Sequence, residues 1–342
     1  MSSINFNAPW DPLQHVWMGA SYGPEFYEPI RDHQVRDSLQ RISTETEEDY
    51  QNLKKVLESF GIRVDRPVID SSTTIMDYVN NQGHVDYHTS KSFTLIPRPP
   101  MQPRDSVLVI GDIMIGTNQE FDWFEPLVNG LLEANPRIPY DINKIFDGAL
   151  ITVIGKHVIV DCRDHPWLPN YIQNLFPDRS VISVTIGGHN DAVFCPVRPG
   201  LIVSTYHHDH YAETFPDWKI KFIDNQSWNA IPDWRKYKHN NVDKWWVPDN
   251  INNAEFNQFV NTWLNNWLGY VKETVFDVNM LQLDPHTILV NNYNKEMFEF
   301  FKLHRIEPIV VPFRHRFFWD GGIHCVTADI QRQGEAHDYI SR

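Results

Sequence analysis

One short pattern recurs along the chain and constrains its fold more than any other feature. An acidic residue opens an apolar run, a tight turn follows, and a second apolar run returns. The clearest copies are RDSVLVIGDIMIGT, FDGALITVIGKHVIVD, HNDAVFCPVRPGLIVS and FDVNMLQLDPHTILVNN, which begin at residues 104, 146, 189 and 276. Their turns carry glycine or proline, because glycine tolerates positive φ and proline presets its own φ. The pattern therefore predicts four β-hairpins.

Helix-like stretches and short strands follow these hairpins and extend the pattern to both ends of the chain. The N-terminal part predicts a strand at 10–20, a helix at 37–60 and a strand at 62–69, and GGIHCVTADI at 321–330 begins the last module. Further helices are predicted within 118–136, 166–176, 254–271 and 294–306. The chain thus forms about five strand-strand-helix-strand modules, which would most simply close into a ring, although an open α/β sheet also alternates strands and helices. In a ring, the residues that open each first strand converge on the axis.

Composition narrows the class of protein. With 44 acidic and 30 basic residues, the formal net charge is −14, which argues against a nucleic-acid or anionic-membrane surface. Such a charge suits small cationic substrates, but it also serves solubility alone. The N-terminal residues lack a charged start followed by an apolar run, and no run of about 18 apolar residues occurs, so we expect a cytoplasmic protein. The three cysteines are widely spaced with no CxxC, which indicates reduced thiols and no zinc site.

One region breaks the repeat. Residues 205–252 are aromatic, rich in asparagine and proline, and without clear periodicity. They could form a lid over a site or a variable surface excursion packed down by its tryptophans. The HHDH run at 207–210 has no partner pair at ligand spacing, so no metal site is predicted there. We therefore expect one domain over 1–342 with an aromatic-rich insertion at about 205–252.

The openings of the modules carry the ionisable and nucleophilic side chains that could form a site. These are Asp105, Asp147, His189, Asp191 and Cys325. A cysteine needs a nearby base or cation to become a nucleophilic thiolate, and a histidine oriented by a carboxylate supplies one. The remaining carboxylates suit a planar cation such as a guanidinium, which offers several donors in a fixed fork. Singly, each acid is more typical of a turn or strand edge, but the repeated placement favours a joint role.

The same segments carry a resemblance. In order, WDPLQHVWMG, QPRDSVLVIG, FDGALITVIG, HNDAVF, RPGLIVS and DGGIHCVTADIQRQGE resemble the motifs of the arginine:glycine amidinotransferase family and its inosamine-phosphate amidinotransferase relatives. The resemblance runs from about Trp10 to Glu335, interrupted by the aromatic insertion. It implies the pentein fold, a five-bladed α/β propeller of pseudo-fivefold ββαβ modules with its site on the axis.

The resemblance also implies a role for each candidate. Cys325 would be the nucleophile, His189 the general acid and base, and Asp147 the carboxylate that orients this histidine. Asp105 and Asp191 match positions that hold the guanidinium in the family. The implied chemistry is ping-pong transfer from a small guanidino donor to an acceptor amine through an amidino-cysteine, with no metal or organic cofactor.

One departure from the family concerns the substrate. The relatives that use free arginine have an arginine shortly after a GPG turn, where it binds the α-carboxylate of the substrate. This chain reads RPGLIVSTYHHDHY there, which puts His208 near that place. The replacement candidates are Arg198, Arg314, Arg316 and Lys272. Amidino transfer is therefore better supported than any named substrate.

Two alternatives stay open. Agmatine and arginine deiminases share the fold, the cysteine and histidine chemistry and a similar approach to the cysteine, and only water or an amine as second nucleophile separates the two reactions. A non-catalytic guanidino-binding protein would also share the fold, but the intact set of Cys325, His189 and Asp147 speaks against it. The order of motifs along the whole chain favours the transferase. The acceptor and the oligomeric state, a homodimer included, are not set by the sequence.

Overall fold

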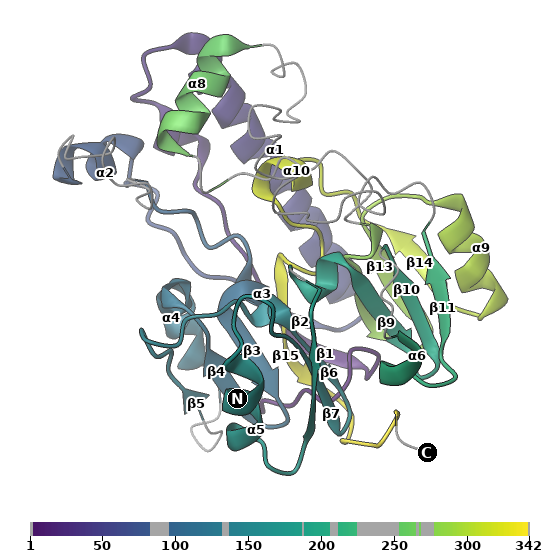
Figure 1. Cartoon of the computed structure of the whole chain (residues 1–342). Helices are drawn as coiled ribbons and strands as arrows, with labels where there is room; N and C mark the ends of the chain where they lie inside the picture. The colour runs from purple at the N-terminus through teal and green to yellow at the C-terminus, as the bar shows by residue number, and fades with distance from the viewer. Residues whose placement is uncertain are drawn as a thin grey trace.

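The strands of the protein form five small sheets of one repeated design. The computed structural model describes residues 3–82, 96–131, 137–186, 188–205, 211–223, 253–264, 267 and 277–340 (Figure 1). Within these residues, each sheet has three strands, of which the first two are antiparallel and the third is parallel to the middle one. The sheets are β15-β1-β2 (Thr327–Arg332, Leu13–Met18, Arg63–Asp65), β3-β4-β5 (Val107–Ile110, Ile113–Gly116, Arg137–Ile138), β6-β7-β8 (Ile151–Ile154, His157–Asp161, Ser180–Val184), β9-β10-β11 (Phe194–Arg198, Leu201–Ser204, Lys219–Phe222) and β12-β13-β14 (Leu281–Asp284, Thr287–Val290, Glu307–Val310).

The four predicted hairpins are confirmed. Each lies at its expected place as β3-β4, β6-β7, β9-β10 and β12-β13. The turn of the second hairpin requires glycine twice over, because Gly155 has φ +60° and a Cβ there would lie 1.9 Å from the carbonyl oxygen of His337. The fifth sheet joins the two ends of the chain, since β1 pairs with the C-terminal β15. The prediction that 321–330 leads into the last module is therefore confirmed.

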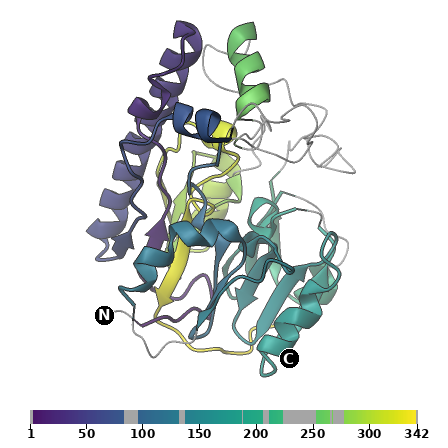
Figure 2. The same cartoon turned by 90° about the vertical axis from the view of Figure 1, so that its left-hand side faces the viewer.

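The long N-terminal helix is α1 (His33–Ser59). It begins four residues before the predicted start, because the side chain of Asp32 caps it by accepting a hydrogen bond from the backbone N–H of Val35. Leucines on its inner face are buried, and α8 (Ala254–Trp263) packs against it. Both helices project beyond the sheets on the same side of the molecule (Figures 1 and 2).

The other helices are shorter. The predictions at 166–176 and 294–306 are confirmed as α5 (Leu168–Leu175) and α9 (Lys295–Leu303). Within the helix-like stretch predicted at 118–136, the described residues form the 3-10 helix η2 (Gln119–Trp123) and the single turn α4 (Glu125–Val128), whose first turn holds Pro126. Proline cannot donate to a preceding turn, so it favours a new start over continuation. The remaining short helices are η1 (Pro24–Tyr27), α2 (Ile75–Gln82), α3 (Pro103–Ser106), η3 (Gly148–Leu150), η4 (Asn190–Ala192), α6 (Tyr211–Thr214) and α10 (Arg316–Trp319).

The stretch predicted to be irregular contains regular structure. Helix α6 and strand β11 both lie within 205–252, and β11 completes the sheet β9-β10-β11 by pairing in parallel with β10. The part of 205–252 that the structure describes therefore contributes a strand to a sheet. Residues 206–210 and 224–252, which include His208 and the tryptophans from Trp228 to Trp246, lie outside the described residues.

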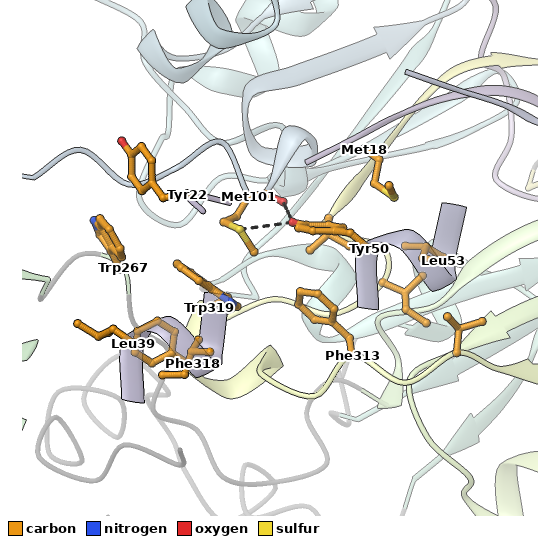
Figure 3. Packing of buried hydrophobic residues seen from close by; sticks show 14 of the residues in the cluster. Met18, Tyr22, Leu39, Tyr50, Leu53, Met101, Trp267, Phe313, Phe318 and Trp319 are labelled. Carbon is orange, nitrogen blue, oxygen red and sulfur yellow. Dashed lines mark hydrogen bonds between the residues drawn. The ribbon is translucent and has the colours of Figure 1, made fainter. Parts of the chain in front are cut away.

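A large apolar cluster attaches α1 to the segment that precedes Cys325 (Figure 3). Trp319 is fully buried there, stacks on Trp267 with ring centroids 5.8 Å apart, and donates its indole N–H to Thr46 Oγ1 of α1 at 2.9 Å. Tyr50 donates its hydroxyl to the carbonyl of Met101 at 3.0 Å. The segments that precede Asp105 and Cys325 are thus both fixed to α1. None of the helices among the described residues is long and apolar enough to cross a membrane.

Candidate active site

Short turns that precede the first strands of the sheets meet at the centre of the molecule. Helix α3 leads into β3, η3 into β6 and η4 into β9, and α3 packs against both η3 and β15 while η3 packs against η4. The five predicted site residues lie on or beside these turns. The structure brings them together in one site, as the placement of the hairpin openings predicts: Asp105, Asp147, His189, Asp191 and Cys325.

His189 lies between two carboxylates. Its Nε2 is 3.3 Å from Asp147 Oδ2, and its Nδ1 is 3.6 Å from Asp105 Oδ1. Asn118, which the sequence reasoning did not single out, donates from Nδ2 to Asp147 Oδ1 at 3.4 Å and to the backbone carbonyl of Asp105 at 3.2 Å. One amide therefore connects the residues on both sides of the imidazole.

The two carboxylates make His189 a cation at neutral pH. Burial alone would lower its pKa, but the charges of Asp105 and Asp147 outweigh burial and raise the pKa to about 9. Burial raises the pKa of Asp105 to about 7 against the opposing charge of His189. Burial also acts to raise the pKa of Asp147, yet the hydrogen bond and charge of His189 lower it overall. An imidazolium held in this way can give a proton to a leaving group.

Cys325 is 3% exposed and lies two residues before the start of β15. Its Sγ accepts a hydrogen bond from Asn279 Nδ2 at 3.0 Å and donates to Asp191 Oδ2 at 3.4 Å. Burial raises the pKa of the thiol well above its ordinary value, and the negative charges of Asp191 and Asp105 raise it further. The thiol is therefore protonated at neutral pH.

Asp191 is held ionised by the histidine that precedes the nucleophile. His324 Nδ1 lies 2.7 Å from Asp191 Oδ2. Burial and the charge of Arg104 lower the pKa of His324, so at neutral pH it is a neutral donor to this carboxylate. Burial acts to raise the pKa of Asp191, but the hydrogen bond from His324 lowers it to about 2. A fixed negative charge thus lies beside Cys325.

The glycine pair before Cys325 leaves room for the side chains around it. A Cβ on Gly321 would lie 3.0 Å from the Cβ of Cys325 and 2.1 Å from Gln102 Nε2. A Cβ on Gly322 would lie 2.7 Å from Asn279 Oδ1 and 2.8 Å from Asn291 Nδ2. Real Cβ atoms essentially never approach other atoms closer than 3.0 Å, so a larger residue at either position would force these amides to shift.

The sequence reasoning missed Asn279 and His324, although signals for both were present. Asn279 opens the fourth hairpin, at the position equivalent to those of the other site residues, but the search favoured ionisable side chains. His324 adjoins the predicted nucleophile. The other cysteines have different partners, because Cys162 Sγ donates to the carbonyl of Val184 at 3.3 Å and Cys195 Sγ accepts from Gln282 Nε2 at 3.0 Å.

The proposed replacements for the carboxylate-binding arginine fall in different places. Arg314 lies against helix α1, with Nη2 2.7 Å from Glu48 Oε2 and Nε 2.8 Å from Asp49 Oδ1, so it fixes the loop to the helix. Arg316 lies near Asp277, whose charge raises its pKa while burial lowers it more. Arg198 ends β9 at the turn of its hairpin. His208 and Lys272 lie outside the described residues.

A further arginine, Arg98, acts on a site residue through its charge. Arg98 donates from Nη2 to the backbone carbonyl of Trp319, next to the glycine pair. Its charge lowers the pKa of Asp105 and of Glu120, although burial raises both overall. The site therefore has one cationic neighbour that the motifs did not indicate. Among the described residues, no group of three or more His, Cys, Asp or Glu side chains could hold a metal ion.

Comparison with known proteins confirms the resemblance to amidinotransferases. No protein-family model matches the chain. A putative inosamine-phosphate amidinotransferase 2 of Streptomyces griseus is 20% identical over an alignment of 396 positions, which covers 99% of both chains. The mitochondrial glycine amidinotransferase of Xenopus tropicalis is 22% identical over an alignment of 398 positions, which covers 97% of this chain and 83% of that protein.

Solved structures show that the fold is shared. The structure of an inosamine-phosphate amidinotransferase from Streptomyces griseus superposes with a TM-score of 0.66 at 16% identity, covering 99% of this chain and 100% of that one. A dimethylarginine dimethylaminohydrolase superposes with a TM-score of 0.55 at 10% identity, covering 92% and 98%. The chain therefore has the mixed α/β fold of the pentein amidinotransferases, and hydrolases share this fold.

Proposed function

We propose that this protein is an amidinotransferase that moves the amidino group from a guanidino donor, with L-arginine as the first candidate, to an acceptor amine. A covalent amidino-cysteine at Cys325 would connect the two half-reactions. The observation that carries the proposal is the joint position of a thiol, a cationic histidine and three carboxylates at the openings of neighbouring hairpins. The amidinotransferases that the chain resembles along nearly its whole length support the same reaction class.

The first half-reaction begins when the donor guanidinium enters between the carboxylates. Its positive charge offsets Asp105 and Asp191, lowers the pKa of Cys325, and lets the thiol proton leave to solvent. The thiolate then forms a bond to the guanidino carbon. As the bond from that carbon to the alkyl nitrogen breaks, protonated His189 gives its proton to this nitrogen, and the amine product departs.

The second half-reaction reverses these steps with another amine. The incoming ammonium group first loses a proton to solvent. As the resulting free amine attacks the amidino carbon, its nitrogen gives a second proton to His189, which is now neutral. The bond from carbon to sulfur breaks, the amidino group leaves on its new nitrogen, and Cys325 returns as a thiolate. Asp147 keeps the imidazole oriented in both directions, since its carboxylate lies 3.3 Å from Nε2. These steps balance with no metal or organic cofactor.

We also propose the arrangement that the resemblance implies. The five three-stranded sheets would be the blades of one propeller, with the site on its axis and the whole chain as a single domain. Contacts among α3, η3, η4 and β15 support this arrangement, because equivalent ends of different sheets meet there. The aromatic insertion would follow β11.

A guanidino hydrolase is the second candidate function, because a hydrolase shares the fold. It would use the same attack of Cys325 on the guanidino carbon but break the bond to an unsubstituted nitrogen. Ammonia then leaves with the proton from His189, and water releases the remaining group from sulfur as a ureido product such as citrulline. The order of motifs along the chain and the amidinotransferase relatives favour an amine. A transferase must keep water away from the intermediate until the acceptor enters.

One experiment separates the two reactions. The purified protein is incubated with arginine alone, and ornithine, citrulline and the mass of the Cys325 peptide are measured. We expect at most about one ornithine per active site and a covalent amidino adduct, because no acceptor is present. Adding amines from a panel should restart ornithine release and give a new guanidino compound.

The control is Cys325→Ser, which should give neither ornithine nor the adduct. Steady citrulline formation without an amine would replace transfer by hydrolysis. If neither arginine nor other guanidino compounds yield any product or adduct, the proposed function is wrong.

A further inference from the structure

Asn279 makes more contacts with the nucleophile than any assigned catalytic residue does. It is fully buried in the loop before β12. Its Oδ1 accepts the backbone N–H of His324 at 2.9 Å and that of Cys325 at 3.1 Å. Its Nδ2 lies 3.0 Å from Cys325 Sγ and 3.0 Å from Asp191 Oδ2. One amide therefore contacts both the backbone and the sulfur of the nucleophile.

These contacts determine which way the amide points. The two backbone N–H groups can only donate, so the atom that faces them must be the carbonyl oxygen of Asn279. The amino group must then face the sulfur and Asp191, and its two hydrogens can serve both. Asn291 fixes the loop behind it, because its Nδ2 donates to the carbonyl of Asn279 at 2.7 Å and its Oδ1 accepts the N–H of Ile323 at 2.9 Å.

The position matters because the surroundings of the sulfur are negative. Asp191 lies 3.4 Å from Sγ, and burial together with Asp191 and Asp105 raises the pKa of the thiol. The hydrogen bond from Asn279 acts in the opposite direction and lowers it. A donor that points at a buried thiolate stabilises the charged form, because water cannot replace the donor there.

We propose that Asn279 is a catalytic residue that stabilises the thiolate of Cys325 through its Nδ2–H while its Oδ1 holds the backbone of the nucleophile in place. The steric limit at Gly322 follows from this role, since any larger residue would displace the amides of Asn279 and Asn291. The inference rests on the proposed function for the identity of the nucleophile. The inference adds a neutral hydrogen-bond donor to a site whose other residues are all ionisable.

The test is the pH dependence of alkylation of Cys325 by iodoacetamide, measured by mass spectrometry of its peptide. In Asn279→Ala we expect the apparent pKa of Cys325 to rise by about one unit or more, which makes alkylation about tenfold slower at a fixed pH below the pKa, or about 1.4 kcal/mol. Asn279→Asp should raise the pKa further. Its carboxylate can still accept both backbone N–H groups, but it puts a negative charge beside the sulfur in place of a donor. This variant therefore separates the support of the backbone from the stabilisation of the thiolate.

A matched control exists in the same core. Gln282 donates from Nε2 to Cys195 Sγ, also at 3.0 Å, and Gln282→Ala should leave the alkylation of Cys325 unchanged. Thermal melting and circular dichroism show which variants are folded. A folded Asn279→Ala or Asn279→Asp with the wild-type profile overturns the inference. Equal shifts in all three variants overturn it as well, because a general loosening of the core would then explain them.

If Asn279→Ala does not fold, Asn279→Asp alone decides by the same criterion. Alkylation needs no substrate, so this result is independent of amidino transfer. A protein whose Cys325 responds as expected but which acts on no guanidino compound would refute the proposed function and leave the inference standing.

Discussion

The charge on His189 gives the sharpest quantitative test of the site. Burial opposes this charge, yet the pKa is raised from 6.5 to about 9, and the charge of Asp105 is the largest single cause that raises it, before the hydrogen bond and the charge of Asp147. At about 1.36 kcal/mol per pKa unit, this net rise of roughly 2.5 units corresponds to about 3.4 kcal/mol in favour of the imidazolium, after the cost of burial. Coulomb's law gives about 4 kcal/mol for unit charges near 4 Å at an effective dielectric constant of about 20, so Asp105 at 3.6 Å supplies a large part of the stabilisation and Asp147 contributes the rest.

Asp105→Asn should therefore lower the pKa of His189. Because 31% of the side chain is exposed, solvent screens part of the interaction, and we expect a fall of about one to two units and not a complete return to 6.5. The pKa would be followed by NMR on protein labelled in its histidine rings, with the resonance of His189 identified by its loss in His189→Asn. Asp141→Asn, which removes an exposed carboxylate, is the control.

The raised pKa of His189 also predicts how the stability of the protein depends on pH. A histidine whose pKa is raised on folding stabilises the native state fully below about pH 6.5 and loses this contribution as pH rises through about 9. In Asp105→Asn this contribution should be smaller and completely lost at a lower pH, and the basic limb of the activity profile should move with it. A His189 that still titrates near 9 in a folded Asp105→Asn protein would refute the electrostatic account.

Three further changes test single features of the site. Cys325→Ser should abolish turnover without lowering the melting temperature appreciably, because a hydroxyl ionises far less readily than a thiol, and a folded, active variant would refute the assignment. Asp147→Asn should slow single-turnover amidination more than it weakens donor binding, since the amide no longer fixes the imidazole, whereas equal losses would remove this division of roles. Gly322→Ala should lower the melting temperature and slow Cys325 alkylation, because its Cβ would lie 2.7 Å from Asn279, and an unchanged alkylation rate would contradict the close packing.

The hairpins could be predicted because their signal is local and repeated. Each hairpin joins two apolar runs by a marked turn. The first strand β3 and the second strand β7 are buried over their whole length, which agrees with that pattern. The helix-like stretch at 118–136 is divided in the structure into η2 and α4, because Pro126 favours the start of a new turn over continuation of the first. Strand β11 was missed because KIKF alternates only briefly within a polar and aromatic stretch, and its pairing with β10 decides its conformation.

The site could be predicted as far as its charges allow. Repetition indicated that the openings of the hairpins converge, which located the acids, His189 and Cys325. It did not indicate Asn279, because a neutral amide has no charge that marks it, and its value depends on which donors and acceptors surround it after folding. The roles of Asn118 and Asn291 have the same origin, since both connect backbone groups that are far apart in the sequence.

The balance of charges at the site explains how a buried thiol can be both protected and reactive. The carboxylates of Asp191 and Asp105 oppose the thiolate, so Cys325 is protonated and reacts poorly with chance electrophiles. In the proposed reaction the same carboxylates would attract a guanidinium, whose charge would cancel the opposition when the target carbon arrives. Asn279 contributes differently, because a neutral donor favours the thiolate at every stage and adds no repulsion against a cation. A lysine in its place would stabilise the thiolate more strongly but would repel the proposed guanidino donor, so an amide suits a nucleophile whose substrate would itself be positive.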